Sequence, residues 1–353
     1  MINNLIIQSA NSEIKIGPGN PVFIVAEISA NHNQSIDLAK GLIDAAAQAG
    51  ANAVKMQTYT ADTITIDSDK EYFKITGGNW AGETLYSLYQ KAYTPWEWQA
   101  ELKTYAEGKD LVWFSAPFDQ TAVSFLEGLG VSLYKIAGYE FADLPLLQAV
   151  AKTGKPVVAS AAMASVEDIA WSIKILRDNG CSHLAILHCI NAYPANPEEM
   201  NISTITDIIN RFGVVSGLSD HSLGAEAAVA AVAAGASIIE KHIIISRQSD
   251  SPDKEFSLEP DEFKSLVNAV RETEKIIGRP KYGAGLSEQP NEKFKRSLFV
   301  VKDIKRGETF TEENVRSIRP GYGLPPKFLP KIMGKKAVQD IERGTPLSND
   351  LID

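Results

Sequence analysis

Short apolar runs separated by amphipathic stretches fill the first 280 residues of the chain. Eight of these runs are rich in Val and Ile and apolar at successive positions, as parallel strands buried on both faces are. They lie at residues 22–28, 53–58, 112–118, 133–138, 156–161, 184–190, 214–219 and 238–243. Eight strand–helix units over about 250 residues predict an α/β fold, a closed (β/α)₈ (TIM) barrel. A doubly wound open sheet is the alternative, which the unbroken alternation disfavours.

Helical spacing fills the intervals between the runs, for example at 35–49 and 165–178. Ser165, followed by acidic residues in the first turn, is typical of a helix start. The longest interval, 59–94, follows the second run and holds an unusual number of aromatic side chains. They are Tyr59, Tyr72, Phe73, Trp80, Tyr86, Tyr89 and Tyr93. An insertion at this end of a barrel strand lies over the active site, so it predicts a lid or specificity wall. A packed surface loop with aromatic anchors is the alternative interpretation.

Pro, Gly and charged residues mark a linker near the end of the chain, which predicts three parts. Residues 1–280 form the barrel, 281–295 the linker, and 296–353 a small C-terminal domain. A domain of roughly sixty residues is marginally stable by itself. We therefore expect it to dock on its own barrel or on a second chain.

The composition is that of an ordinary globular protein, with 44% hydrophobic and 22% charged residues. No apolar run reaches the roughly 18 residues of a membrane span, and the N-terminus does not resemble a signal peptide. Two cysteines are too few for a disulfide framework, so we expect a cytoplasmic protein. A net charge of −9 without a basic stripe argues against a nucleic-acid partner.

Polar side chains gather at the C-terminal ends of the predicted strands, where a barrel builds its active site. They are Glu27, Lys55, Gln57, Ser115, Lys135, Glu140, Ser160, Asn191, Tyr193, Ser219, Asp220, His221, Glu240, Lys241 and His242. Buried lysines cost several kcal/mol unless they are paired. Lys55 and Lys135 together therefore indicate an anion site. Glu27 suits proton transfer or water positioning if burial raises its pKa, and an ion pair with Lys55 is the alternative.

His221 and His242 close the seventh and eighth predicted strands. Neighbouring strands lie about 5 Å apart, so the two imidazoles could share a divalent cation with open positions for water and substrate. Two His with oxygen ligands suit Mn²⁺, Fe²⁺, Co²⁺ or Zn²⁺. Two hydrogen-bonded structural histidines are the alternative, and the spacing leaves both interpretations open. His32 is a candidate to line the pocket, whereas His183 and His188 are interpreted as structural.

Several motifs in fixed order resemble the sialic acid synthase family. They are A-E-I-S-A-N-H-N (26–33), V-K-M-Q-T-Y (54–59), Y-K-I-A (134–137), G-L-S-D-H-S (217–222), I-E-K-H (239–242) and S-I-R-P-G-Y-G (317–323). The last lies in a segment that resembles the antifreeze-like (SAF) domain of these enzymes. E-I-S-A-N-H-N in place of E-I-G-x-N-H, together with D-S-D-K-E-Y-F-K-I and A-Y-T-P-W-E-W, resembles the pseudaminic acid branch.

The resemblance implies that phosphoenolpyruvate condenses with an open-chain diacetamido sugar of altro configuration, releasing phosphate. A legionaminate or N-acetylneuraminate synthase is the alternative within the family. It also implies a divalent metal, Mn²⁺ first and Mg²⁺ or Co²⁺ as alternatives, and a domain-swapped homodimer.

The implied roles fall on particular residues. Lys55, Ser115, Lys135, Ser160, Asn191 and Ser219 would hold phosphoenolpyruvate. His221 and His242 would bind the metal, and Glu27 would lie near the reacting carbons. Gln57, Tyr193 and Asp253 would contact the sugar, and Arg319 would reach it from the C-terminal domain.

The chain departs from the family pattern in the expected phosphate cradle. The usual S-T-P-F reads S-A-P-F at Ala116, and Gly138 replaces a Ser. The usual S-T-G-M reads S-A-A-M, with Ala161 and Ala162. Each lost hydroxyl removes a hydrogen bond worth about 0.5–1.5 kcal/mol, so weaker phosphate binding is expected unless backbone amides compensate. Two further alternatives follow: a Schiff-base aldolase using Lys135 or Lys241, and a non-catalytic carbohydrate-binding barrel.

Overall fold

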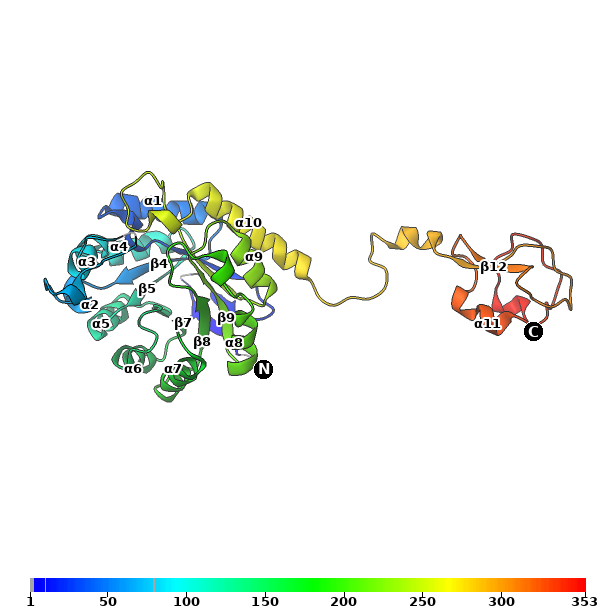
Figure 1. Ribbon diagram of the computed structural model, residues 1–353, viewed down its shortest axis with the longest axis horizontal. Helices are drawn as coiled ribbons and strands as arrows, with labels where there is room; N and C mark the ends of the chain where they lie inside the picture. Colours follow the sequence, from blue (N-terminus) through cyan, green and yellow to red (C-terminus); the bar gives the residue numbers. More distant parts are fainter. Residues whose placement is uncertain (1–2, 10, 79) are drawn as a thin grey trace. The chain divides into compact units, whose positions relative to one another are not determined.

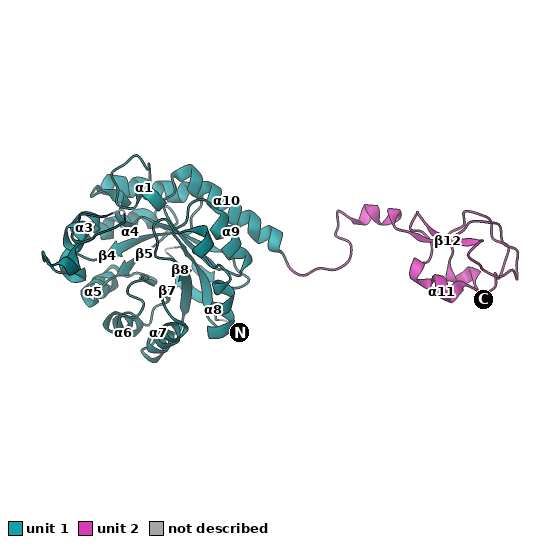
Figure 2. Ribbon diagram, in the orientation of Figure 1, with its two compact units in different colours: residues 1–278 teal, residues 279–353 magenta. Residues whose placement is uncertain are grey.

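The chain divides into two compact units, residues 1–278 and 279–353 (Figure 2). The computed structural model describes residues 3–9, 11–78 and 80–353. Among these residues no helix is long and apolar enough to cross a membrane.

Eight parallel strands form a closed barrel in the order β10-β3-β4-β5-β6-β7-β8-β9 (Figure 1). The strands are β3 (Phe23–Glu27), β4 (Ala53–Thr58), β5 (Val112–Pro117), β6 (Tyr134–Ile136), β7 (Val157–Ala162), β8 (Leu184–Cys189), β9 (Val215–Asp220) and β10 (Ile238–His242). Closure through the β10–β3 pairing confirms the barrel and excludes the open sheet. Each predicted strand coincides with an observed one, because a both-faces-buried strand has a continuous apolar pattern.

Helices surround the barrel and cover its outer face (Figure 1). They are α1 (Ile36–Ala49), α4 (Trp96–Glu107), α5 (Gln120–Leu129), α6 (Leu144–Lys152), α7 (Val166–Asp178), α8 (Thr204–Phe212), α9 (Glu226–Ala233) and α10 (Pro260–Ile277). Ser165 caps α7 as the sequence predicts, because its hydroxyl accepts a hydrogen bond from the Asp168 amide. Ser35 caps α1 in the same way.

An N-terminal hairpin closes the lower end of the barrel, and the sequence did not predict it. Its strands are β1 (Leu5–Gln8) and β2 (Glu13–Ile16). Leu5, Ile7 and Ile16 pack into one cluster with the inward-facing residues at the first positions of the barrel strands, including Phe23. The described residues of the hairpin therefore fill the lumen at the N-terminal ends of the strands, and the opposite, C-terminal ends remain for a site.

The insertion after β4 folds into short ordered elements: α2 (Ala61–Ile64), the 3₁₀ turn η2 (Glu71–Phe73) and α3 (Leu85–Ala92). Thr84 caps α3 by accepting a hydrogen bond from the Ser87 amide at 3.1 Å. The Trp80 indole donates to the Pro252 carbonyl at 3.1 Å, which ties the insertion to the loop after β10. The insertion is thus built into the rim of the barrel.

The unit 279–353 has a hydrophobic core of its own, which includes Leu298, Phe310 and Leu347. It contains the antiparallel pair β11 (Ser297–Val300) and β12 (Val315–Ile318), the short helix α11 (Leu329–Ile332), and the 3₁₀ turns η5 (Gln289–Phe294), η6 (Pro326–Phe328) and η7 (Asn349–Leu351). Arg319 is exposed one residue beyond the end of β12.

Candidate active site

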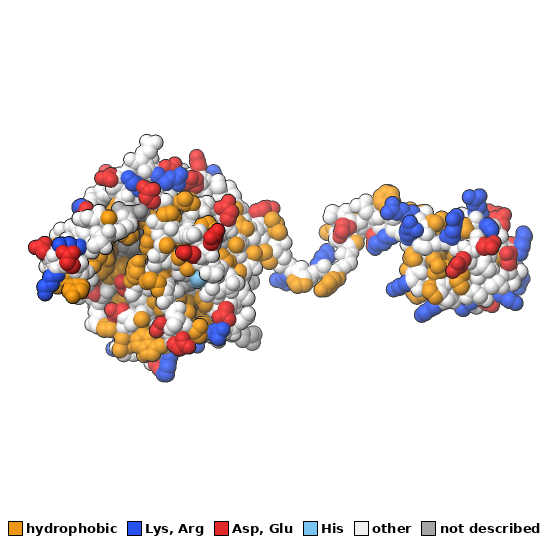
Figure 3. Space-filling view, in the orientation of Figure 1, with side chains coloured by type: hydrophobic (Ala, Val, Ile, Leu, Met, Phe, Trp, Pro, Cys, Tyr) orange, Lys and Arg blue, Asp and Glu red, His pale blue; other side chains and the backbone are white. Residues whose placement is uncertain are grey.

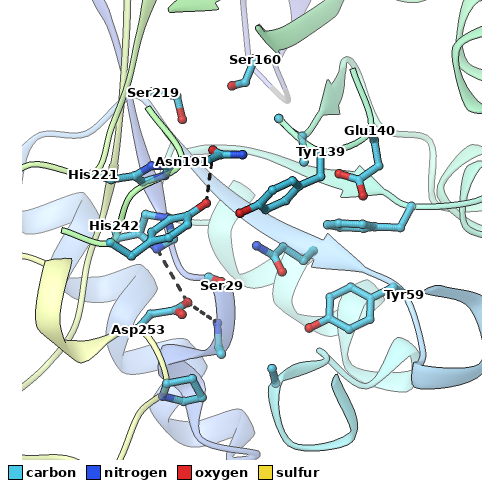
Figure 4. A pocket seen from close by; sticks show the side chains of 18 of the residues that line it. Ser29, Tyr59, Tyr139, Glu140, Ser160, Asn191, Ser219, His221, His242 and Asp253 are labelled. Carbon is cyan, nitrogen blue, oxygen red and sulfur yellow. Dashed lines mark hydrogen bonds and ion pairs between the residues drawn. The ribbon is translucent and has the colours of Figure 1, made fainter. Parts of the chain in front are cut away.

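A cavity of about 510 Å³ opens at the C-terminal ends of the barrel strands. Ten of the residues predicted for the site line it: Lys55, Gln57, Lys135, Ser160, Asn191, Tyr193, Ser219, His221, His242 and Asp253. Figure 4 shows His221, His242 and Asp253 on one side and Tyr139, Glu140 and Tyr59 on the other. Strand ends far apart in the sequence therefore meet at one opening.

Two buried lysines and a carboxylate form the base of the cavity. Lys135 donates a hydrogen bond from Nζ to Ser160 Oγ at 2.6 Å. Glu240 Oε1 lies 3.4 Å from Lys135 Nζ and 3.7 Å from Lys55 Nζ, and it accepts a hydrogen bond from Ser219 Oγ at 2.9 Å. One carboxylate thus partly neutralises two ammonium groups that are only 2% and 4% exposed.

The electrostatics of this cluster depend on burial and on the two opposite charges. Burial lowers the pKa of Lys135 more than Glu240 raises it. Burial also disfavours the charged form of Lys55, but Glu240 and Glu27 outweigh that effect and raise its pKa. Burial would raise the pKa of Glu240, but Lys135 and Lys55 lower it, so it is held as a carboxylate. An incoming anion therefore meets fixed positive charge in a desolvated site.

Glu27 ends β3 in register with Lys55 of β4, and it is not among the described residues that line the cavity. Its carboxylate forms an ion pair with Lys55 on the neighbouring strand. Burial raises its pKa to about 7, against the opposing effect of Lys55. The ion pair named as the alternative interpretation is therefore present, and the raised pKa leaves Glu27 able to exchange a proton near neutrality.

His221 and His242 lie on one side of the cavity with their ring centroids 5.4 Å apart. His221 Nδ1 donates to the Ile190 carbonyl at 2.8 Å, which leaves the Nε2 lone pair available. His242 Nδ1 is buried without a hydrogen-bond partner in the described part of the chain, and it lies 3.8 Å from Asp253 Oδ2. Burial lowers the pKa of His221 to about 4 and holds the pKa of His242 well below its usual value. Both rings are therefore neutral, the form that binds metal ions.

The donor set fits an open divalent-cation site made of two imidazoles and a nearby carboxylate. Among the described residues, no three His, Cys, Asp or Glu side chains are grouped closely enough to enclose a metal ion. Water and substrate oxygens would have to supply the remaining ligands, as in catalytic rather than structural metal sites.

Ser115 does not join the cavity. Its Oγ lies 2.6 Å from Thr58 Oγ1 and is fully buried, outside the residues that line the pocket. Successive strand residues face opposite sides, and Phe114 and Val112 of β5 belong to the inner cluster, so Ser115 faces outward. The next residue, Ala116, faces inward like Phe114, because residues two apart on a strand lie on the same face. The geometry gives Ser115 no route to a substrate.

His32 also lies away from the cavity. Its Nε2 is 3.1 Å from Thr94 Oγ1, and its Nδ1 accepts a hydrogen bond from the Gln34 amide. The ring packs edge-on against Trp98. His32 therefore anchors the end of the insertion. It does not line the pocket, although the sequence analysis made it a candidate to do so.

The insertion contributes the apolar wall of the cavity. Its lining residues are Ile64, Ile75, Trp80, Leu85, Leu88, Tyr89 and Ala92. The insertion is thus a wall of the site, as predicted from its place after β4.

Opposite the histidines, Glu140 has a buried Oε2 without a hydrogen-bond partner among the described residues, and burial raises its pKa to about 7.

Glu140 and Glu240 line the cavity as strand-end residues to which the sequence gave no role, and Ser29 lines it without having been selected from the sequence. Glu240 lies two residues from both Ile238 and His242 along β10, so all three side chains point to the same face of the strand. This spacing was the signal that could have assigned Glu240 to the site. Ser29 has a left-handed backbone, φ 45°, a conformation that favours glycine. No local pattern predicts a strained serine at this position.

Buried lysines, neutral histidines and an apolar wall at the C-terminal mouth of a (β/α)₈ barrel define a barrel enzyme that acts on a small anionic substrate. The chain matches the NeuB family over residues 42–282 and the SAF domain over residues 295–353. It belongs to the NeuB family, which confirms the resemblance to sialic acid synthases.

The chain is 44% identical to the pseudaminic acid synthase of Campylobacter jejuni (strain 81-176) over 326 residues, 92% of this chain and 95% of the relative. It is 42% identical to the pseudaminic acid synthase of Helicobacter pylori over 335 residues, 94% of this chain and 98% of the relative. The crystal structure of the N-acetylneuraminic acid synthetase of Leptospira borgpetersenii in complex with citrate is similar, with a TM-score of 0.71 and 34% identity. That match covers 82% of this chain and 96% of the other.

Proposed function

We propose that this protein condenses phosphoenolpyruvate with 2,4-diacetamido-2,4,6-trideoxy-L-altrose to give pseudaminic acid and phosphate. The observation that carries the proposal is the meeting of Lys55, Lys135 and the His221–His242 pair in one cavity. The similarity to two pseudaminic acid synthases along nearly the whole chain supports the choice of sugar.

Phosphoenolpyruvate occupies the base of the cavity in this proposal. Its phosphate and carboxylate take the place of water beside Lys55 and Lys135, with Ser160 and Asn191 as hydrogen-bond donors. Ser219 becomes a third donor once its hydroxyl turns from Glu240 toward the substrate. Ionised partners make these bonds about twice as strong as neutral ones. The sugar lies above, against Gln57, Tyr193 and Asp253, with the aromatic insertion as its outer wall.

His221 and His242, with Asp253 nearby, would hold the divalent metal ion, which we propose is Mn²⁺. When bound, the ion supplies a Lewis acid that makes the sugar aldehyde carbon more electrophilic. Carbon 3 of phosphoenolpyruvate bonds to that carbon, and the aldehyde oxygen takes up a proton. Water, positioned by the Glu27–Lys55 pair, adds to carbon 2 of the former phosphoenolpyruvate. The C–O bond to phosphate then breaks, and Lys55 and Lys135 offset the charge on the leaving group.

The proposal includes a homodimer in which Arg319 of one copy reaches the sugar in the barrel of the other. The charge distribution supports such docking. Residues 279–353 carry 15 Lys and Arg against 10 Asp and Glu, whereas residues 1–278 carry 20 against 34. Lys and Arg are prominent on the small unit in Figure 3. Opposite net charges favour association of the two kinds of unit. A cytoplasmic location, where phosphoenolpyruvate is made, completes the proposal.

The test is a phosphate-release assay with phosphoenolpyruvate, Mn²⁺ and a panel of sugars. We expect the altro diacetamido sugar to react faster than its manno isomer or N-acetylmannosamine, and a chelator to stop the reaction. Equal rates with N-acetylmannosamine would defeat the choice of sugar but retain the family chemistry. Turnover of free pyruvate that borohydride traps on Lys135 would favour the Schiff-base aldolase instead.

A further inference from the structure

Gly138 and Ala162, two departures from the family pattern, lie against each other in the wall of the active site. Gly138 follows β6, and Ala162 is the last residue of β7. A Cβ placed on Gly138 would lie 2.8 Å from the Cβ of Ala162, closer than real Cβ atoms approach. The φ angle of Gly138 lies outside the left-handed region, so this glycine is required by packing and not by backbone conformation.

The amide of Asn191 occupies the other side of the same space. The added Cβ would lie 2.9 Å from Asn191 Nδ2 and 3.1 Å from its Oδ1. Asn191 Oδ1 accepts a hydrogen bond from the Tyr193 hydroxyl at 3.3 Å. Nδ2 is buried and has no hydrogen-bond partner within the described residues. Since Asn191 and Gly138 both line the cavity, an unused donor faces the position where a side chain is absent.

The two departures offset each other in volume. A Cβ at 138 and the Cβ of Ala162 would lie only 2.8 Å apart, so only one of the two positions can carry a Cβ without a shift. In this chain the Cβ belongs to β7 and carries no hydroxyl. A methyl cannot donate a hydrogen bond, so the Asn191 amide is the side-chain donor left at this point of the wall.

We propose that Gly138 and Ala162 form a reciprocal steric pair that determines how the site holds its anion: the Ala162 methyl keeps position 138 free of a side chain, and Asn191 Nδ2 donates to the substrate oxygen there. The inference rests on the proposed function, in which that oxygen belongs to phosphoenolpyruvate. The departures at Gly138 and Ala162 are then a matched pair and do not by themselves indicate lost activity.

A double-mutant cycle tests the pair. Gly138→Ser alone forces its Cβ against Ala162 and Asn191, so we expect the KM for phosphoenolpyruvate to rise about tenfold or more and the Tm to fall. Ala162→Gly alone removes one methyl and should change this KM by less than about threefold. The double variant removes the contact with Ala162, and the Asn191 amide, at the end of its side chain, can turn away from the new Cβ. Both Tm and KM should then return to near the wild-type values, because the new hydroxyl supplies a donor in place of the amide.

Gly128→Ser is the matched control, since Gly128 is exposed on α5 and a Cβ there meets no described atom within 4 Å. It should leave the KM unchanged. Additive effects in the cycle, with the double variant as impaired as Gly138→Ser, would overturn the pairing. Asn191→Ala should weaken phosphoenolpyruvate binding measured by calorimetry, and unchanged binding would overturn the role of Asn191. Failure of the proposed function is a separate result, because the wild-type protein would then release no phosphate with any sugar.

Discussion

Lys55 and Lys135 are held at the base of the cavity by Glu27 and Glu240, and each of these four side chains is at most 5% exposed. Removing one member of such a cluster leaves an uncompensated buried charge, at a cost of about 3–5 kcal/mol. The sequence predicted the lysines, because lysine is rare in an apolar strand. It did not predict Glu240 as their shared partner, because the β9–β10 pairing that places Ser219 beside Glu240 is a property of the closed sheet.

Glu140 provides a pH-dependent contribution to stability. Burial raises its pKa from 4.5 to about 7. The folded state therefore holds a proton that the unfolded chain has released between these values, so stability falls as pH rises through this window. We expect Glu140→Gln, which resembles the neutral acid, to be more stable than the wild type above pH 7, by on the order of 2–3 kcal/mol.

Denaturant unfolding at pH 5 and pH 8 measures this effect. The difference between wild type and Glu140→Gln should be larger at pH 8. Glu97→Gln, an exposed substitution on α4, serves as the control and should not change the pH dependence. An identical pH dependence for wild type and Glu140→Gln would show that this carboxyl is ionised at low pH like an ordinary one.

At the scale of elements, strand phase decides which predicted residues reach the site. Ten reach it because the continuous apolar pattern located each strand end correctly. Ser115 does not, because a pattern that is apolar on both faces carries no information about which face is inward. The hairpin β1–β2 escaped prediction for a related reason: its strands have only four residues each, and their burial depends on a lumen formed by distant strands.

The hairpin gives a test with a control on the same strand. Ile7 is 1% exposed in the inner cluster, whereas its neighbour Ile6 is 38% exposed on the opposite face. We expect Ile7→Ala to lower the free energy of unfolding by about 2–5 kcal/mol, and Ile6→Ala to change it by less than about 0.5 kcal/mol. Chemical denaturation of both variants measures the difference. Equal losses would mean that the hairpin does not plug the barrel.

At the scale of the whole molecule, the acidic barrel and the basic C-terminal unit are each incomplete in the proposed function. The sequence predicted the boundary between them from a linker rich in Pro, Gly and charged residues. Each unit has its own hydrophobic core. Their mutual placement follows from neither core, so it must be tested by experiments on the assembled protein.

Complementation between two impaired variants tests the proposed exchange of Arg319. His221→Ala disables the barrel and Arg319→Ala disables the C-terminal contribution, so each should be nearly inactive alone. After unfolding and refolding in an equal mixture, half of the dimers would combine one intact barrel with one intact Arg319. Phosphate release should then return to about a quarter of the wild-type rate. No recovery, with mixed dimers verified by native mass spectrometry, would mean that Arg319 serves its own barrel or none.

Leu5, Ile7 and Ile16 close the N-terminal end of the barrel, so substrates and products enter and leave the cavity through its C-terminal opening. In the proposed function, phosphoenolpyruvate binds to Lys55 and Lys135 at the base of the cavity, so it has to bind before the sugar covers it. Phosphate can then leave only after the sugar-acid product has left. The fold therefore predicts an ordered mechanism of substrate binding and product release. Initial-rate kinetics that fit a random order would contradict it.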